Sequence, residues 1–137
     1  LYGKMAGLCY DLLLEQKISW PLLRTALAGA LATRAELVSI VSSVEDDTSN
    51  SPIVAEVGEA QGQFRMRLSL YLRDYPVPPT SEVISKLASL LGTQILVSDD
   101  SPNPYSMILI EAGCPPRKVA LDVARLDQHE EYCIVEE

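Results

Sequence analysis

The stretch that most constrains the fold is residues 64–73, where apolar and polar side chains alternate almost without exception. Successive side chains of a β-strand point to opposite faces of its sheet. The alternation therefore predicts a strand with one face on a hydrophobic core and the other face in water. The apolar face comprises Phe64, Met66, Leu68, Leu70 and Leu72, and the other comprises Arg65, Arg67, Ser69, Tyr71 and Arg73.

The second informative unit is a helix followed by two strands. Apolar residues recur at helical spacing over residues 80–91, and Gly92 can end this helix because glycine adopts positive φ without steric penalty. Two apolar runs, 95–97 and 107–110, flank the turn-forming residues 99–104. The unit therefore predicts a helix, a strand, an acidic turn and a returning strand.

The same reasoning assigns the rest of the chain. Helices are predicted over 4–16 and 20–33, strands over 37–44, 53–57, 119–123 and 132–135, and loops or extended links over 45–52, 75–79 and 125–131. The order is two helices, three strands, one helix and four strands (ααβββαββββ). This order predicts an α+β fold, with helices packed on one face of a mainly antiparallel sheet. From the length of 137 residues we expect a single α+β domain over 1–137.

The apolar content and the cysteines bear on where the protein works. The longest apolar run, residues 22–32, is interrupted by an arginine, a threonine and a glycine, so it predicts no membrane span. Cys9, Cys114 and Cys133 are odd in number and far apart, which is typical of free thiols in a reducing compartment. We therefore expect a cytoplasmic protein that does not bind membranes.

The net charge of −8 is distributed unevenly along the chain. Residues 1–44 carry four basic and three acidic side chains, whereas residues 45–137 carry seven basic and sixteen acidic ones. Nucleic-acid binding depends on lysine and arginine contacts to phosphates. The acidity of the second part therefore argues against a nucleic-acid partner and favours a basic protein partner.

The sequence offers no set of residues with the spacing of a catalytic or metal site. The only histidine, His129, lies in the acidic stretch 127–131, which is typical of a solvated surface histidine. Zinc-binding His-Glu-x-x-His spacing, closely spaced cysteines, a glycine-rich phosphate loop and a Gly-x-Ser-x-Gly elbow are all missing. The acidic segments 46–47 and 99–101 lack the spacing of a calcium loop. We therefore expect no catalytic residues, no metal and no cofactor, and do not favour an enzyme.

Topology gives the main functional hypothesis. If every strand after 37–44 joins its neighbour in the antiparallel sense, most of the acidic loops meet at one end of the molecule. Clustered like charges speed encounter with an oppositely charged surface. We therefore predict a non-catalytic protein-binding module, with an immunity or inhibitor protein that neutralises a basic toxin or nuclease as a concrete version. The predicted partner-binding residues are Asp46, Asp47, Asp99, Asp100, Tyr105, Glu130 and Glu131.

Two alternatives remain open on the sequence. The first is a small-ligand-binding protein or an enzyme with a pocket between helix and sheet. Its candidate residues are Arg65, Arg67, Tyr71 and His129. The second is a structural homodimer, joined either through the alanine-rich helix 20–33 or through the exposed strand 132–135.

Overall fold

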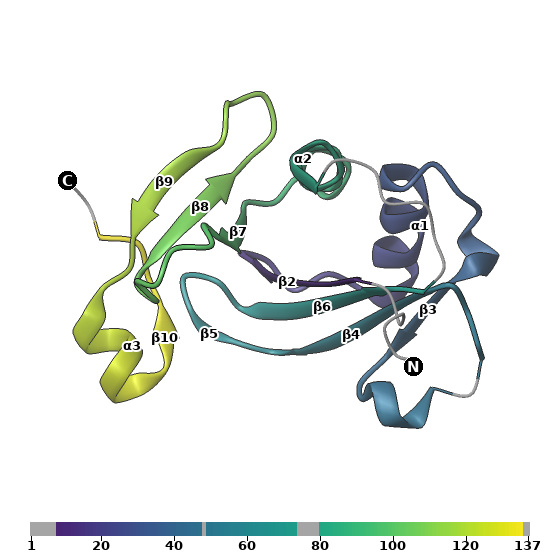
Figure 1. Ribbon diagram of the computed structural model, residues 1–137, viewed down its shortest axis with the longest axis horizontal. Helices are drawn as coiled ribbons and strands as arrows, with labels where there is room; N and C mark the ends of the chain where they lie inside the picture. Colours follow the sequence, from purple (N-terminus) through teal and green to yellow (C-terminus); the bar gives the residue numbers. More distant parts are fainter. Residues whose placement is uncertain (1–7, 48, 74–79, 136–137) are drawn as a thin grey trace.

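A seven-stranded sheet dominates the computed structural model, which describes residues 8–47, 49–73 and 80–135 (Figure 1). The strands are β2 (Leu8–Leu14), β3 (Val38–Val41), β4 (Ile53–Glu59), β6 (Met66–Leu72), β7 (Ile95–Ser98), β8 (Ser106–Ile110) and β9 (Arg117–Ala120). Their order in the sheet is β3-β4-β6-β2-β7-β8-β9. All neighbours are antiparallel except β3 and β4, which are parallel. The predicted α+β class with a mainly antiparallel sheet is confirmed.

Two helices, α1 (Trp20–Ala30) and α2 (Thr80–Leu91), lie side by side over one face of the sheet (Figure 1). A shorter helix, α3 (Val123–His129), precedes β10 (Glu131–Tyr132), which pairs with β5 (Gln61–Gly62) in a separate two-stranded sheet. Two 3₁₀ turns, η1 (Ala35–Leu37) and η2 (Val44–Asp46), flank β3. None of the helices within the described residues is long and apolar enough to cross a bilayer.

The centre of the fold is the unit β2-α1-β4-β6-α2-β7. Its four strands stand in the sheet order β4-β6-β2-β7, with every neighbouring pair antiparallel. This arrangement is the split β-α-β, or ferredoxin-like, topology. Strand β3 extends the sheet at one edge, and the β8–β9 hairpin extends it at the other.

The larger hydrophobic cluster fills the space between the two long helices and the sheet. Alternate residues of β6, namely Met66, Leu68, Leu70 and Leu72, enter this cluster, as the alternation predicts. The small side chains of α1 let the helices approach closely, since a Cβ at Gly29 would lie 3.1 Å from Cδ1 of Leu90. The alanine-rich face considered for a homodimer is therefore occupied inside the chain, where Ala26, Ala28 and Ala30 are buried.

A second, smaller cluster lies on the opposite face, towards the β7–β9 edge. Its buried members are Leu13, Ala60, Phe64, Leu96, Leu109, Val119 and Leu121. The prediction that this face is wet is therefore wrong for that part of the sheet. Phe64 also departs from expectation, because it precedes β6 and packs here rather than with Met66.

The first element within the described residues is strand β2, which corrects the described part of the helix predicted over 4–16. Strand β2 occupies the middle of the sheet, with Leu12 and Leu14 in the larger cluster and Leu13 in the smaller one. A strand covered on both faces has a continuous apolar run, which local periodicity does not distinguish from a helix. Residues 4–7 of the predicted helix and the predicted link 75–79 lie outside the described residues.

The last third of the chain also departs from prediction in detail. Strand β9 ends at Ala120, and α3 begins at Val123 after Asp122, whose carboxylate accepts a hydrogen bond from the Arg125 N–H. The segment predicted as a loop or single turn is therefore mostly helix. The strand predicted over 132–135 is the short β10 followed by an isolated bridge between Leu121 and Ile134. The exposed strand considered for a homodimer is thus paired within the chain.

Candidate functional site

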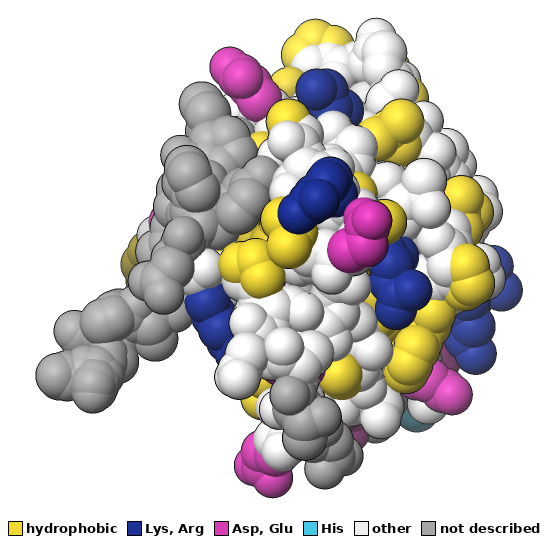
Figure 2. Space-filling model, turned by 90° about the vertical axis from the view of Figure 1, so that its right-hand side faces the viewer, with side chains coloured by type: hydrophobic (Ala, Val, Ile, Leu, Met, Phe, Trp, Pro, Cys, Tyr) yellow, Lys and Arg dark blue, Asp and Glu magenta, His cyan; other side chains and the backbone are white. Residues whose placement is uncertain are grey.

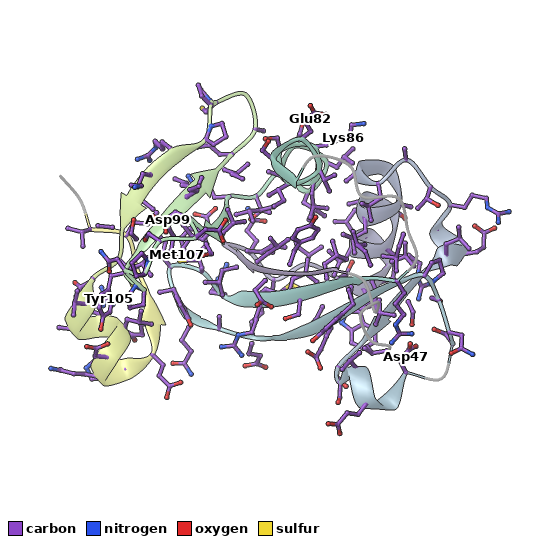
Figure 3. All side chains as sticks on the ribbon, in the orientation of Figure 1. Asp47, Glu82, Lys86, Asp99, Tyr105 and Met107 are labelled. Carbon is purple, nitrogen blue, oxygen red and sulfur yellow. The ribbon has the colours of Figure 1, made fainter. Side chains whose placement is uncertain are left out.

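The structure does not gather the seven predicted partner-binding residues at one end. Asp47 lies towards one end of the long axis, whereas Asp99 and Tyr105 lie towards the other (Figure 3). The physical reason is the order of the strands: Asp47 is held by Ser39 of β3, at one edge of the sheet, whereas Asp99 follows β7, four positions away in the order β3-β4-β6-β2-β7. Asp46, in η2, shares the end of Asp47.

Figure 2 shows the face at the right-hand side of Figure 1, beside α1 and β3. Among the side chains coloured there, acidic groups stand singly between basic and hydrophobic ones. The predicted acidic cluster is therefore not present on this face. The other five predicted residues belong to the opposite end, in the β7–β8 loop and in the segment of α3 and β10.

The carboxylate of Asp47 is engaged inside the protein, with its side chain 1% exposed. It accepts hydrogen bonds from the hydroxyls of Ser49 at 2.6 Å and Ser39 at 3.2 Å, and its Oδ2 lies 3.3 Å from Nη1 of Arg73. The pKa of Asp47 is lowered, chiefly by the Ser49 hydrogen bond. Asp47 therefore fixes the loop that follows β3 instead of facing a partner.

Asp99 has the same structural role in the β7–β8 loop, with its side chain 4% exposed. Its carboxylate accepts hydrogen bonds from the Ser106 hydroxyl at 2.5 Å and the Ser101 N–H at 3.0 Å, and Nζ of Lys118 lies 3.7 Å away. These interactions, the Ser106 hydrogen bond above all, lower the pKa of Asp99 to about 2. The Asp99 carboxylate thus holds the β7–β8 loop against the start of β8.

We expect this carboxylate to make the protein sensitive to acid. The folded pKa of about 2 is below the ordinary value of 3.8, so the stabilisation is fully present above pH 3.8 and is lost as the pH falls towards 2. In urea unfolding, Asp99→Asn should therefore be less stable than the wild type at neutral pH, and the difference should shrink over this interval. A stability difference that does not change with pH would contradict the assignment of this acid sensitivity to Asp99.

In an NMR titration, Ser106→Ala should raise the pKa of Asp99 towards 3.8.

A hydrogen bond between side chains joins the β7–β8 loop to α3. The Tyr105 hydroxyl donates to the Asp127 carboxylate, with oxygen–oxygen distances of 2.8 and 3.0 Å, and this interaction raises the pKa of Tyr105. Nε of Arg125 donates to Oε1 of Glu131 at 3.1 Å. Of the five predicted residues at this end, only Asp100 and Glu130 therefore present exposed carboxylates without a hydrogen bond or ion pair in the described part of the chain.

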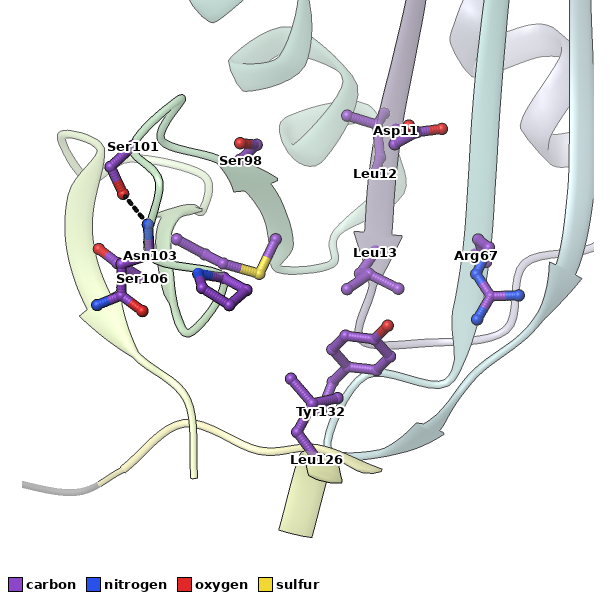
Figure 4. Close-up of a pocket in the computed structure, with 12 residues that line it drawn as sticks. Asp11, Leu12, Leu13, Arg67, Ser98, Ser101, Asn103, Ser106, Leu126 and Tyr132 are labelled. Atoms are coloured by element: carbon purple, nitrogen blue, oxygen red, sulfur yellow. Dashed lines mark hydrogen bonds between the residues drawn. The ribbon is translucent and has the colours of Figure 1, made fainter. Parts of the chain in front are cut away.

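A cleft of about 520 Å³ lies between the joined loop and the sheet (Figure 4). It is lined by Asp11, Leu12, Leu13, Arg67, Ser98, Ser101, Asn103, Pro104, Ser106, Met107, Leu126 and Tyr132. The β7–β8 loop forms one side, Arg67 of β6 stands on the opposite side, and Leu126 and Tyr132 close the end (Figure 4). Leu13, Met107, Leu126 and Tyr132 belong to or pack against the smaller hydrophobic cluster and give the cleft an apolar floor.

Sequence reasoning found only part of this cleft. Of the four residues considered for a pocket, Arg67 lines it, whereas Arg65, Tyr71 and His129 do not. Met107, Leu126 and Tyr132 were not identified. The available signal was the apolar character of Leu126 and Tyr132 within an otherwise acidic stretch.

The chemistry of the cleft is that of a binding site with few charges. Among the described residues that line it, only Asp11 and Arg67 are charged. Within residues 8–47, 49–73 and 80–135, no group of three or more histidine, cysteine, aspartate or glutamate side chains is arranged to hold a metal ion. Comparisons with models of protein families, with curated proteins and with solved structures find no match to this chain.

Proposed function

We propose that the protein is a non-catalytic binding module that holds a partner protein at the end formed by the β7–β8 loop and by α3 and β10. The observation that carries this proposal is the hydrogen bond from Tyr105 to Asp127, which fixes two segments beside an apolar cleft. An apolar centre surrounded by a polar rim is the usual composition of a protein interface. Fixing both segments before binding lowers the entropy lost when a partner docks.

The partner that we propose is a basic protein. The chain carries a net charge of −8, and Asp100 and Glu130 present exposed carboxylates at this end. Such charges attract a positively charged surface and speed its encounter. An inhibitor or immunity protein for a basic toxin or nuclease is the concrete version. The unpaired thiols of Cys114 and Cys133 support the cytoplasm as its location.

The test is to measure association with a panel of basic nuclease domains by surface plasmon resonance at low and at physiological salt. For the tightest binder, the double variant Asp100→Asn/Glu130→Gln should associate about threefold to tenfold more slowly at low salt, because two carboxylates leave the docking end. The salt dependence of the association rate should become flatter.

The matched control is Glu36→Gln/Glu45→Gln, which makes the same charge change in η1 and η2, at the opposite end. It should keep an association rate close to that of the wild type at physiological salt. Equal effects of the two double variants would show that only net charge matters and would contradict a docking surface at this end. Failure of every nuclease domain to bind would contradict the proposed class of partner.

A further inference from the structure

We infer that the cleft binds a monocarboxylic acid with an apolar body, and that Arg67 is the residue that anchors its carboxylate. This inference is independent of the proposed basic partner, because it depends on the groups inside the cleft and not on the charges at its rim.

The first step concerns Arg67, whose guanidinium has no hydrogen bond or ion pair within the described residues. Its side chain extends over Gly58. A Cβ at this glycine would lie 3.9 Å from Nη1 of Arg67, which is an ordinary van der Waals distance. Arginine presents up to five N–H donors in a planar arrangement that matches a carboxylate. Arg67 is therefore an exposed cation at the side of an apolar cleft with its donors unused.

The second step concerns the opposite side of the cleft, where side-chain oxygens already accept hydrogen bonds from the backbone. Oγ of Ser98 accepts from the Asp100 N–H at 3.0 Å, and Oγ of Ser101 accepts from the Asn103 N–H at 3.3 Å. Oδ1 of Asn103 accepts from the Tyr105 N–H at 3.0 Å. The Ser101 hydroxyl is already engaged, because its side-chain hydrogen bond to the Asp99 carboxylate helps to lower the pKa of Asp99. The hydroxyl hydrogen of Ser98 and the amide hydrogens of Asn103 donate to no acceptor among the described residues.

The third step adds Tyr132, which enters the cleft from β10 and has no hydrogen-bond partner for its hydroxyl in the described part of the chain (Figure 4). Groups able to donate therefore stand on two sides of the cleft and at its end. A ligand that satisfies them is rich in acceptor atoms. The apolar floor requires that the rest of this ligand be apolar, and about 520 Å³ is a usual size for a small-molecule pocket.

Asp11 sets the limit on the ligand's charge. Its carboxylate also lines the cleft, and it accepts a hydrogen bond from the Ser69 hydroxyl at 2.7 Å. On the sheet, Ser69 pairs with Asp11 and the next outward-facing pair is Leu13 with Arg67, so the cation and the anion are diagonal neighbours. Like charges repel, so a ligand with one negative charge is favoured over a phosphate or a dicarboxylate.

Two sources supply this chemistry, namely a free carboxylic acid and the C-terminus of a peptide that ends in an apolar residue. The experiment is an NMR titration of the full chain with octanoate, octanamide, the acetylated peptide Ala-Ala-Leu, its C-terminal amide, and inorganic phosphate. We expect at least one of the two acids to shift the amide signals of the β7–β8 loop and β10, with a dissociation constant in the millimolar range or below. Binding by the peptide acid alone identifies a protein terminus, and binding by octanoate alone identifies a free acid.

Variants of Arg67, Arg65 and Asp11 test whether Arg67 binds the carboxylate of the ligand. Arg67→Gln should weaken binding about tenfold or more, since it removes a charge-assisted hydrogen bond. Arg65→Gln makes the same change on a residue outside the cleft lining and should alter the affinity less than about twofold. Asp11→Asn keeps an acceptor for Ser69 and should strengthen binding about threefold by removing the like charge.

Several results would overturn the inference. The first is that the amides bind as tightly as the acids. The second is that phosphate binds as tightly as octanoate, and the third is that Arg67→Gln and Arg65→Gln weaken binding equally. Absence of shifts in the cleft with either acid would overturn it as well. Retained dispersion in the amide spectrum of each unliganded variant shows that the fold is intact, so a loss of binding reports on the site.

Discussion

Replacing Phe64 with alanine is expected to lower the free energy of unfolding by about 3–5 kcal/mol. The side chain is 0% exposed and is the largest fully buried one in the described part of the chain. It lies in the smaller cluster with Leu13 and Leu96, which β2 and β7 supply to that face of the sheet. Removing the ring leaves a cavity that neighbouring side chains fill only in part, and the lost contacts and the cavity both destabilise the fold.

Urea unfolding followed by circular dichroism measures this change. The control is Leu22→Ala, which removes an apolar side chain that is 48% exposed on α1 and should cost less than about 0.5 kcal/mol. A similar cost for the two substitutions would mean that the smaller cluster does not support the fold. Because Tyr105, Met107, Leu126 and Tyr132 pack against this cluster, the phenylalanine variant should also loosen the cleft.

The second large effect is expected at Gly62, in the short strand that pairs with β10. Its φ is +97°, and a Cβ there would lie 2.7 Å from the backbone nitrogen of Tyr132 and 3.0 Å from Sγ of Cys133. Gly62→Ala should therefore cost about 3 kcal/mol, because it combines an unfavourable backbone conformation with a clash against backbone that has to move.

Gly113→Ala is the matched control, because its φ is +77° and a Cβ there meets nothing within 4 Å. That substitution should cost about 1–2 kcal/mol, from the backbone conformation alone. Thermal and urea unfolding of the two variants separates the steric contribution from the conformational one. Equal losses of stability would show that β10 is free to move away from β5.

Elements with a strong local pattern were predictable from the sequence. The alternation over 64–73 gave β6, and the helix that ends at Gly92 gave α2 and the strands after it. Gly92 has φ +64°, and the N–H of Thr93 returns to the carbonyl of Ala88, as expected of a glycine that ends a helix. Local chemistry sets these elements, so no knowledge of distant contacts was required.

The errors arise where distant contacts decide the structure. Strand β2 is central because β6 and β7 pair with its two sides, which its own residues do not reveal. The order of the strands in the sheet is also set by distant contacts, and this order separates Asp47, which is bonded to Ser39 of β3, from Asp99, which follows β7. The cleft likewise combines residues of β2, β6, β8, α3 and β10, whose separation along the chain conceals their proximity.

The C-terminal segment is attached to the rest of the protein in a way that links its motion to the ligand that we propose for the cleft. It is held by the two-residue pairing of β10 with β5, by the isolated bridge between Leu121 and Ile134, by packing against the smaller cluster, and by hydrogen bonds that include those from the N–H groups of Gln63 and Phe64 to the Tyr132 carbonyl and the one from Tyr105. Because its strand pairings are no longer than two residues, this segment is expected to open by local unfolding while the sheet under α1 and α2 stays intact. A ligand that contacts Leu126 and Tyr132 stabilises only the closed state, so its affinity appears as slower hydrogen exchange over 123–135, with the exchange of α1 unchanged.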